Sequence, residues 1–120
     1  MSTTVLIVDD HASFRSFARA LLQAEGYRVV GEAGDGSSGI GEIRRLRPDL
    51  VLLDVQLPDI DGFEVLKRLT AAGDRAAIVL ISSRDASAYR RRLAESGARG
   101  FIPKSELSAA SIRALLGAVG

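Results

Sequence analysis

The sequence predicts an α/β fold, in which a single domain is built on a doubly wound, five-stranded parallel sheet. Short apolar runs rich in β-branched residues alternate with stretches that repeat apolar residues at helical spacing. Two of these runs, Leu50–Leu53 and Ile78–Ile81, are apolar at every position, which is typical of strands buried on both faces. The length of 120 residues suits one domain. Strands that alternate with helices favour a parallel sheet covered on both faces through right-handed crossovers.

The first predicted strand is the β-branched run Val5–Val8, and the second is Arg28–Ala33. A helix is predicted between them, and Gly26 ends it because glycine readily adopts the left-handed conformation found after helices. The buried stripe of this helix is expected to consist of Phe14, Phe17, Ala18, Leu21 and Leu22.

A second helix is predicted ahead of the third strand, Leu50–Leu53. Ser37 or Ser38 is expected to cap its amino end, because a hydroxyl oxygen can accept a hydrogen bond from a free N–H of the first turn. Pro48 ends this helix. The residues that it turns toward the core are Ile40, Ile43 and Leu46.

The third helix is predicted to begin at Asp61, which caps it, and to bury Phe63, Leu66 and Leu69. The fourth strand is Ile78–Ile81. Asp85 is expected to cap the next helix, which Gly97 ends. The remaining elements are that helix, from about Ala86 to Ser96, a short strand over Arg99–Ile102, and a helix from about Ser108 to Val119.

The composition excludes several classes of function. Hydrophobic residues make up 47% of the chain and charged residues 26%, which is ordinary for a folded domain. The absence of Cys excludes a disulfide framework and a thiol nucleophile, and a single His excludes a site built from several His. A net charge of +1 gives no electrostatic basis for direct contact with nucleic acid. No apolar run approaches the roughly 18 residues that cross a bilayer, so we expect a cytoplasmic chain without membrane contact.

Residues that can carry chemistry follow the ends of four predicted strands. Ligands of a doubly wound sheet bind beyond the carboxyl ends of its strands, so these side chains are expected to meet at one edge. If the first and third strands are neighbours, the three carboxylates lie close enough to resist joint ionisation. The residues are Asp9 and Asp10 after the first strand, Asp54 after the third, Ser82 after the fourth and Lys104 after the last.

These carboxylates predict a Mg²⁺ site, because a hard divalent cation relieves their repulsion and prefers oxygen ligands with open water positions. Lys104, one of the two lysines in the chain, and Ser82 would supply a positive charge and a hydrogen bond to phosphoryl oxygens. An Asp beside Mg²⁺ can attack phosphorus and become an aspartyl phosphate. The residues therefore predict phosphoryl chemistry on a carboxylate.

A structural role explains an isolated Asp more often than a functional one, because Asp caps helices and closes turns. We assign Asp49, Asp59 and Asp74 to such roles. A purely structural role does not account for Asp10, Asp54 and Lys104 together, because each follows an apolar run at the same predicted sheet edge.

Four segments carry motifs that point to one family. They are Val5–His11 (VLIVDDH), Pro48–Gly62 (PDLVLLDVQLPDIDG), Ile81–Ser83 (ISS) and Gly97–Lys104 (GARGFIPK). In this order they resemble the receiver domain of bacterial two-component response regulators, and the resemblance extends from about residue 4 to residue 119. It implies a flavodoxin-like fold of five strand–helix units with strand order 2-1-3-4-5, and we expect residues 1–120 to form one receiver domain.

The resemblance implies a role for each residue of the acidic site. Asp54 matches the phospho-acceptor. Asp10 matches a direct Mg²⁺ ligand, and Asp9 one that acts more through water. The backbone carbonyl of Gln56 matches the remaining protein ligand to Mg²⁺, and Lys104 matches the residue that pairs with the phosphoryl group.

Two further residues match a conformational switch. Ser82 corresponds to the hydroxyl residue that moves to the phosphoryl group, and Phe101 to the aromatic residue that fills the vacated space. The resemblance places the output surface, and a phosphorylation-dependent homodimer, on the helix–strand–helix region from Ala86 to Val119. A phosphoryl group makes charge-assisted hydrogen bonds in only one of the two conformations of the switch, so phosphorylation increases the population of that conformation.

The resemblance implies a phosphorylation-controlled switch rather than an enzyme that acts on a metabolite, with self-phosphorylation and autodephosphorylation as its only chemistry. A sensor histidine kinase would donate the phosphoryl group to Asp54 in a Mg²⁺-dependent reaction. Gln56 and Arg84 lie next to the acidic site and are expected to set the lifetime of the phosphorylated Asp54. The kinase is expected to contact the exposed face of the first helix, around Ser16, Arg19 and Gln23.

Two details are similar to the NarL/LuxR-type subfamily, whose members usually carry a C-terminal helix-turn-helix domain. Ser105 follows Lys104 where many receivers have Pro, and the acidic pair is followed by His11. We expect the chain to be the amino-terminal domain of a larger DNA-binding transcription regulator. The alternative is a stand-alone receiver that signals through protein–protein contacts.

Other residues are expected to have structural roles. His11, the only histidine, is expected to be exposed at the start of the first helix rather than to bind metal. Arg90–Arg92 spread around a helix and are expected to form a solvated face. Tyr89 and Leu93, four residues apart, are expected to pack in the core.

Two other classes of protein remain as alternatives. Gly34, Gly36 and Gly39 match the G-x-G-x-x-G pattern of dinucleotide-binding domains, but the pattern follows the second strand and leaves Lys104 without a role. A haloacid-dehalogenase-like phosphatase also uses an Asp nucleophile with Mg²⁺. It would carry Asp-x-Asp on the first strand, whereas this strand is followed by two adjacent aspartates and a histidine.

Overall fold

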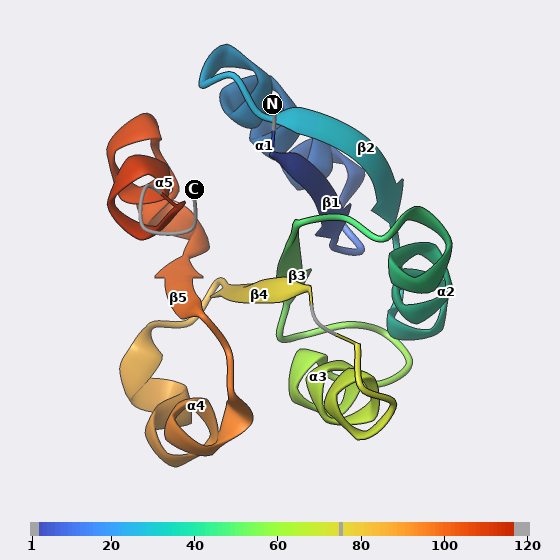
Figure 1. Ribbon diagram of the computed structural model, residues 1–120. Helices are drawn as coiled ribbons and strands as arrows, with labels where there is room; N and C mark the ends of the chain where they lie inside the picture. The colour runs from blue at the N-terminus through green and yellow to red at the C-terminus, as the bar shows by residue number, and fades with distance from the viewer. Residues whose placement is uncertain (1–2, 75, 117–120) are drawn as a thin grey trace.

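The computed structural model describes residues 3–74 and 76–116 of the chain. Five parallel strands form one sheet in the order β2-β1-β3-β4-β5, which confirms the predicted fold (Figure 1). The strands are β1 (Thr4–Val8), β2 (Arg28–Ala33), β3 (Leu50–Asp54), β4 (Ala77–Ser82) and β5 (Gly100–Pro103).

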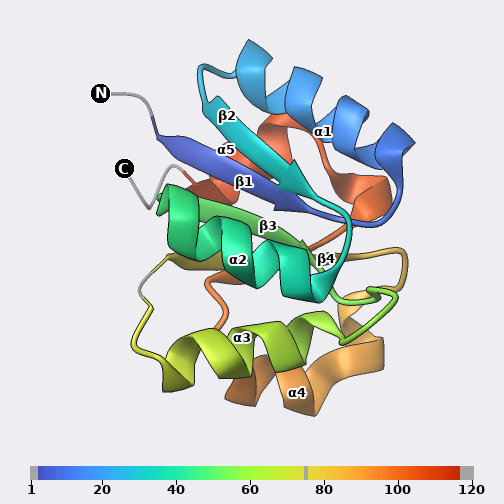
Figure 2. The same ribbon diagram turned by 90° about the vertical axis from the view of Figure 1, so that its right-hand side faces the viewer.

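Helices cover both faces of the sheet (Figure 2). The helices α1 and α5 lie on one face, and α2, α3 and α4 lie on the other, as a right-handed doubly wound fold requires. They are α1 (Ala12–Ala24), α2 (Gly36–Leu46), α3 (Gly62–Ala71), α4 (Arg90–Ser96) and α5 (Ala109–Leu116), with 3₁₀ helices η1 (Ala86–Tyr89) and η2 (Lys104–Glu106).

The core consists of two apolar layers, one on each side of the sheet. Alternate residues of a strand point to opposite faces, so a strand that is covered on both faces has no exposed position. In β3, Val51 and Leu53 pack on the side of α2 and α3, whereas Leu50 and Leu52 pack on the side of α1 and α5. This arrangement explains why the central strands read as continuous apolar runs.

The helix α1 ends where the sequence predicts, but the set of residues that it buries differs from the prediction. Gly26 has φ +89° and follows the last turn, as predicted. Phe17 is 51% exposed, so its assignment to the buried stripe was wrong. Each residue advances about 100° around a helix, which places Phe17 far around the axis from the buried Ala18 and Leu22. Its ring lies beside Phe14 instead, with the ring centroids 6.2 Å apart.

The cap of α2 is Asp35, and neither Ser37 nor Ser38 takes the predicted role. The Asp35 carboxylate accepts a hydrogen bond from the Ser38 N–H at 2.7 Å. The remaining free N–H groups of the first turn belong to Gly36 and Ser37, and both donate to the carboxylate of Asp59 at 2.8 and 3.0 Å. Asp59 therefore caps a helix that lies more than twenty residues earlier in the chain.

The segment predicted as one helix over residues 86–96 is divided in two. Asp85 caps η1 by accepting a hydrogen bond from the Ser87 N–H, as predicted, but the helix is 3₁₀ until Tyr89. Tyr89 has φ −126° and ψ 15°, which interrupts the helical path and turns its ring into the core. Gly97 ends α4 with φ +77°, as predicted.

The predicted last helix is present, and its described part is α5, Ala109–Leu116. Ser108 precedes it, and the Ser108 hydroxyl accepts a hydrogen bond from the Ser111 N–H at 3.1 Å. The predicted end of this helix, residues 117–119, lies outside the described residues.

Candidate functional site

The carboxyl ends of the strands bring the predicted residues to one edge of the sheet. In the register, Val8 at the end of β1 pairs with Leu53 of β3, so Asp9 and Asp54 are neighbours. Asp54 in turn pairs with Ile81 of β4, which places Ser82 beside the same edge. Lys104 begins η2 directly after β5.

A lysine bridges the two buried carboxylates of this edge. Asp9 is fully buried and Asp54 is 2% exposed. The Lys104 Nζ lies 2.6 Å from Asp9 Oδ2 and 3.2 Å from Asp54 Oδ2. The ammonium also lies 4.6 Å from the centre of the Phe14 ring, so an apolar wall limits its access to water.

The ionisation of these groups follows from their surroundings. Burial raises the pKa of Asp54 to about 6, the negative charge of Asp9 adds to this rise, and the Gln56 N–H and Lys104 oppose it. Burial alone would lower the pKa of Lys104, but its bonds to Asp9 and Asp54 outweigh burial and raise that pKa. The lysine therefore stays charged, while Asp54 ionises fully only above about pH 6.

The donor set at this edge suits a hard divalent cation. Asp9, Asp10, His11 and Asp54 each offer one ligand atom, and these atoms lie within 4.8 Å of one another. Three of the four donors are carboxylate oxygens, which Mg²⁺ prefers, and Asp10 is open to water. The residues present therefore fit the predicted cation.

His11 is exposed and precedes α1, as predicted, but its ring also contacts the acidic pair. Its Nδ1 lies 3.0 Å from Asp10 Oδ1 and 3.3 Å from Asp9 Oδ1. The sequence showed that His11 adjoins two carboxylates, but the direction of its side chain is decided by the fold. Gln56, the other predicted neighbour, donates its N–H to Asp54 Oδ1 at 3.1 Å.

The two predicted switch residues lie beside Tyr89, for which the sequence predicts core packing alone. Ser82 is fully buried, and its Oγ lies 3.0 Å from the hydroxyl oxygen of Tyr89. Tyr89 and Leu93 belong to the core cluster, as predicted. The ring of Tyr89 lies 6.0 Å from that of Phe101. A tyrosine seven residues after a buried serine is too weak a sequence signal to predict the bond between them.

Two predicted surface features also differ in detail. Arg90–Arg92 are exposed, as predicted, but Arg92 also pairs with Asp61 at 2.8 Å and lies 4.2 Å over the Phe63 ring. On α1, Ser16 and Gln23 are exposed as predicted. Arg19, which was expected on the same open face, is partly covered because it pairs with Glu32 of β2 at 2.7 Å.

The glycine pattern after β2 has a packing role. A Cβ on Gly39 would lie 2.9 Å from Val8 Cγ1, and a Cβ on Gly36 would collide with the Ile60 side chain. The N–H groups that cradle phosphate in a dinucleotide-binding domain are bound here by Asp35 and Asp59. These contacts leave no basis for the dinucleotide-binding alternative.

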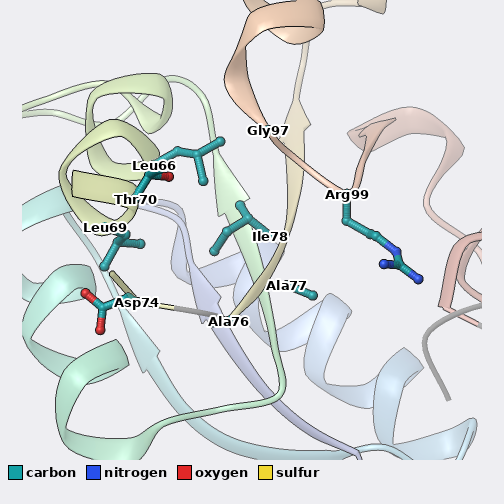
Figure 3. A pocket seen from close by; sticks show the side chains of 9 residues that line it. All are labelled: Leu66, Leu69, Thr70, Asp74, Ala76, Ala77, Ile78, Gly97 and Arg99. Carbon is teal, nitrogen blue, oxygen red and sulfur yellow. The ribbon is translucent and has the colours of Figure 1, made fainter. Parts of the chain in front are cut away.

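A separate hollow of about 290 Å³ lies near the opposite edge of the sheet, between α3 and the start of β4 (Figure 3). Leu66, Leu69 and Ile78 line it together with Asp74, while the side chain of Arg99 extends away from the others. It shares no lining residue with the acidic edge.

The fold and the acidic edge define a class of protein. The response regulator receiver domain family matches residues 5–116, and the chain belongs to this family. The transcription regulator BvgA of Bordetella pertussis is 39% identical over 106 residues, which are 88% of this chain and 51% of BvgA. The DNA-binding transcriptional activator EvgA of Escherichia coli is 31% identical over 101 residues, 84% of this chain and 50% of EvgA.

Solved structures identify the type of receiver. The signal receiver domain of the response regulator NarL from Mycobacterium tuberculosis is 32% identical, with a TM-score of 0.88 over 98% of this chain and 96% of that one. A LuxR-family response regulator from Aurantimonas is 29% identical, with a TM-score of 0.89 over 99% and 86% of the two chains. The chain is therefore similar to receivers of the NarL/LuxR type, as predicted.

The chain spans about half the length of the curated relatives it matches. Among residues 3–74 and 76–116, no helix has both the length and the apolar character needed to cross a membrane.

Proposed function

We propose that Asp54 accepts a phosphoryl group from the phosphohistidine of a sensor kinase and thereby switches the conformation of the domain. The observation that carries this proposal is a buried Asp54 carboxylate held 3.2 Å from a charged lysine, with two more carboxylates at the same sheet edge. One carboxylate oxygen of Asp54 forms a bond to phosphorus while the bond between phosphorus and the imidazole nitrogen breaks. The released nitrogen takes a proton from solvent.

The residues of the chain divide the work of this step. Asp54 must be ionised to attack phosphorus, and burial, which raises its pKa, opposes that ionisation. Lys104, which now bridges Asp54 and Asp9, would donate to a phosphoryl oxygen, and Ser82 would donate its hydroxyl.

Asp9, Asp10, Asp54 and the carbonyl of Gln56 would hold Mg²⁺, while His11 lies beside them. When bound, Mg²⁺ neutralises charge on the phosphoryl oxygens. The buried Asp9 would keep the cation close to Asp54. Asp10 is exposed, so the phosphoryl donor would approach the cation from its side.

The output is proposed to be transcription control through a DNA-binding domain that follows the receiver. This proposal is supported by relatives named as transcription regulators and by the chain's match to about half of their length. The surface that changes on phosphorylation would comprise α4, β5 and α5, where Phe101 packs on Tyr89, and a homodimer would form there. The stand-alone receiver, which would signal through protein–protein contacts, remains the alternative.

The lifetime of the phosphorylated state is proposed to depend on Gln56 and Arg84. Gln56 is exposed beside the site, and its Oε1 accepts a hydrogen bond from the Ser83 hydroxyl at 3.3 Å. An amide held beside Asp54 in this way would position or block the water that hydrolyses the acyl phosphate. Gln56→Ala is expected to change the rate of dephosphorylation, and an unchanged rate would exclude this role.

The proposal is tested by the intact mass of the chain after incubation with acetyl phosphate, with and without Mg²⁺. We expect one phosphoryl adduct that needs Mg²⁺ and that is missing in Asp54→Asn. Uptake by Asp54→Asn would assign the acceptor elsewhere. Continuous release of phosphate from many substrates would favour the phosphatase alternative.

A further inference from the structure

The hydroxyl of Ser82 is engaged with Tyr89 in this structure. Its Oγ lies 3.0 Å from the Tyr89 hydroxyl oxygen and accepts a hydrogen bond from the Arg84 N–H at 3.1 Å. Ser82 is fully buried, so these contacts replace bonds to water. A switch in which the Ser82 hydroxyl moves to a phosphoryl group on Asp54 takes its Oγ away from the Tyr89 hydroxyl, whichever of the two hydroxyls now donates.

Tyr89 is itself held firmly by its surroundings. It is 8% exposed, and its ring lies between those of Phe63, 5.6 Å away, and Phe101, 6.0 Å away. Three residues later, Arg92 lies over Phe63 and pairs with Asp61, which fastens α4 to α3. The Tyr89 hydroxyl is therefore presented to Ser82 by α3, α4 and β5 together.

We propose that Tyr89 is a positioning residue that acts through Ser82, and that its hydroxyl stabilises the resting arrangement of the site. This inference rests on the proposed function, because it assumes that Ser82 serves a phosphoryl group on Asp54. Phe101 has no hydroxyl, so Tyr89 supplies the phenolic group of this aromatic cluster. Ser82 then has two competing partners, the Tyr89 hydroxyl at rest and the phosphoryl oxygens in the switched state.

The proposal predicts the direction of a mutation. An interaction made in one of two arrangements shifts the equilibrium by its own free energy when it is removed. Tyr89→Phe keeps the ring and its packing but removes the bond to Ser82, so the switched arrangement becomes more populated. A buried hydrogen bond of ordinary net strength corresponds to a shift of about two- to tenfold.

The test uses beryllium fluoride with Mg²⁺ as a mimic of the phosphoryl group, titrated into the chain and followed by amide NMR. Tyr89→Phe is expected to bind the mimic about two- to tenfold more tightly than the unmodified chain. The matched control is Tyr27→Phe, since Tyr27 packs in the other core layer, and it is expected to bind like the unmodified chain. Without the mimic, the amide signals of residues 82–84 in Tyr89→Phe should already move toward their bound positions.

A double variant shows whether Tyr89 acts through Ser82. In a Ser82→Ala background, Tyr89→Phe is expected to leave the affinity for the mimic unchanged, because the bond is already absent. The proposal about Tyr89 would be overturned if Tyr89→Phe raised the affinity for the mimic equally in the Ser82→Ala background, or if Tyr89→Phe alone did not raise it. In both cases the unmodified chain still binds the mimic, so the proposed function would stand. If the unmodified chain and Asp54→Asn behave alike, the proposed function itself fails and Tyr89 loses its assigned role.

Discussion

Two aspartates flank the same strand and differ in almost every property. Asp49 immediately precedes β3, and Asp54 is its last residue. Asp49 is exposed, and the N–H and hydroxyl of Thr4 donate to its carboxylate at 2.9 and 3.0 Å, which lowers its pKa. Burial instead raises the pKa of Asp54 to about 6. Hydrogen bonds from Thr4 stabilise the ionised form of Asp49, whereas burial makes the ionised form of the candidate acceptor, Asp54, costly to the fold.

The two shifts have opposite consequences for stability. The folded pKa of Asp49 is lowered, so its contribution is present above the unfolded pKa of about 4 and is lost as the pH falls through the folded value. The folded pKa of Asp54 is raised, so ionising this group costs stability as the pH rises from about 4 to about 6.

The largest expected effect comes from crowding the end of β3 that carries Asp54. A Cβ on Gly62 would lie 2.5 Å from the Asp54 carbonyl oxygen and 3.0 Å from the Val55 Cα. These contacts are backbone atoms, which can move only if the strand moves with them. Gly62→Ala is therefore expected to lower the free energy of unfolding by about 3 kcal/mol, as measured by urea denaturation. Gly41→Ala is the control, because a Cβ on Gly41 meets open space on α2. It should raise stability by up to about 1 kcal/mol, and similar losses in both variants would contradict this account.

Removing the charge of Asp54 is expected to stabilise the chain when no divalent cation is present. At pH 7 the raised pKa of Asp54 corresponds to a cost on the order of 2 kcal/mol, which Asp54→Asn relieves. The gain should shrink as the pH falls from 7 toward 4, because Asp54 is then protonated in the unmodified chain. Urea denaturation across this pH range measures the gain. A destabilised Asp54→Asn at pH 7 would show that the bond to Lys104 outweighs burial.

A smaller effect of opposite sign is expected at Asp49. Asp49→Ala removes the one carboxylate oxygen that accepts both hydrogen bonds from Thr4, so the melting temperature at pH 7 is expected to fall by a few degrees. The difference from the unmodified chain should narrow in acid, since protonation weakens the same bonds in the unmodified chain. A difference that is constant between pH 7 and pH 2.5 would show that the charge of Asp49 has no part in it.

Much of the fold could be predicted from the sequence because its signals are local. A strand covered on both faces must be apolar throughout, and Leu50–Leu53 and Ile78–Ile81 satisfied that rule. Asp61 and Asp85 cap their helices through residues two or three positions later, which a local pattern also contains. The meeting of Asp9 and Asp54 followed from one further rule, that parallel strands end at the same edge.

The contacts that were missed join segments far apart in the chain or depend on a side-chain direction. Asp59 caps α2 from a loop more than twenty residues later, so the nearer serines were preferred in error. Phe17 follows the apolar spacing of α1, but it is 51% exposed and its ring lies beside Phe14. The bond between Ser82 and Tyr89 forms where the chain changes from 3₁₀ to α helix, a change that composition and periodicity do not predict.

The most direct test of the central claim compares Asp54, the last residue of β3, with Asp49, which precedes β3, in one assay. Asp54→Asn and Asp49→Asn are each incubated with acetyl phosphate and Mg²⁺, and their intact masses are compared with that of the unmodified chain. The account predicts a single phosphoryl adduct on the unmodified chain and on Asp49→Asn, and none on Asp54→Asn. An adduct that persists in Asp54→Asn, or that disappears in Asp49→Asn while the chain remains folded, would contradict the assignment of Asp54 as the acceptor.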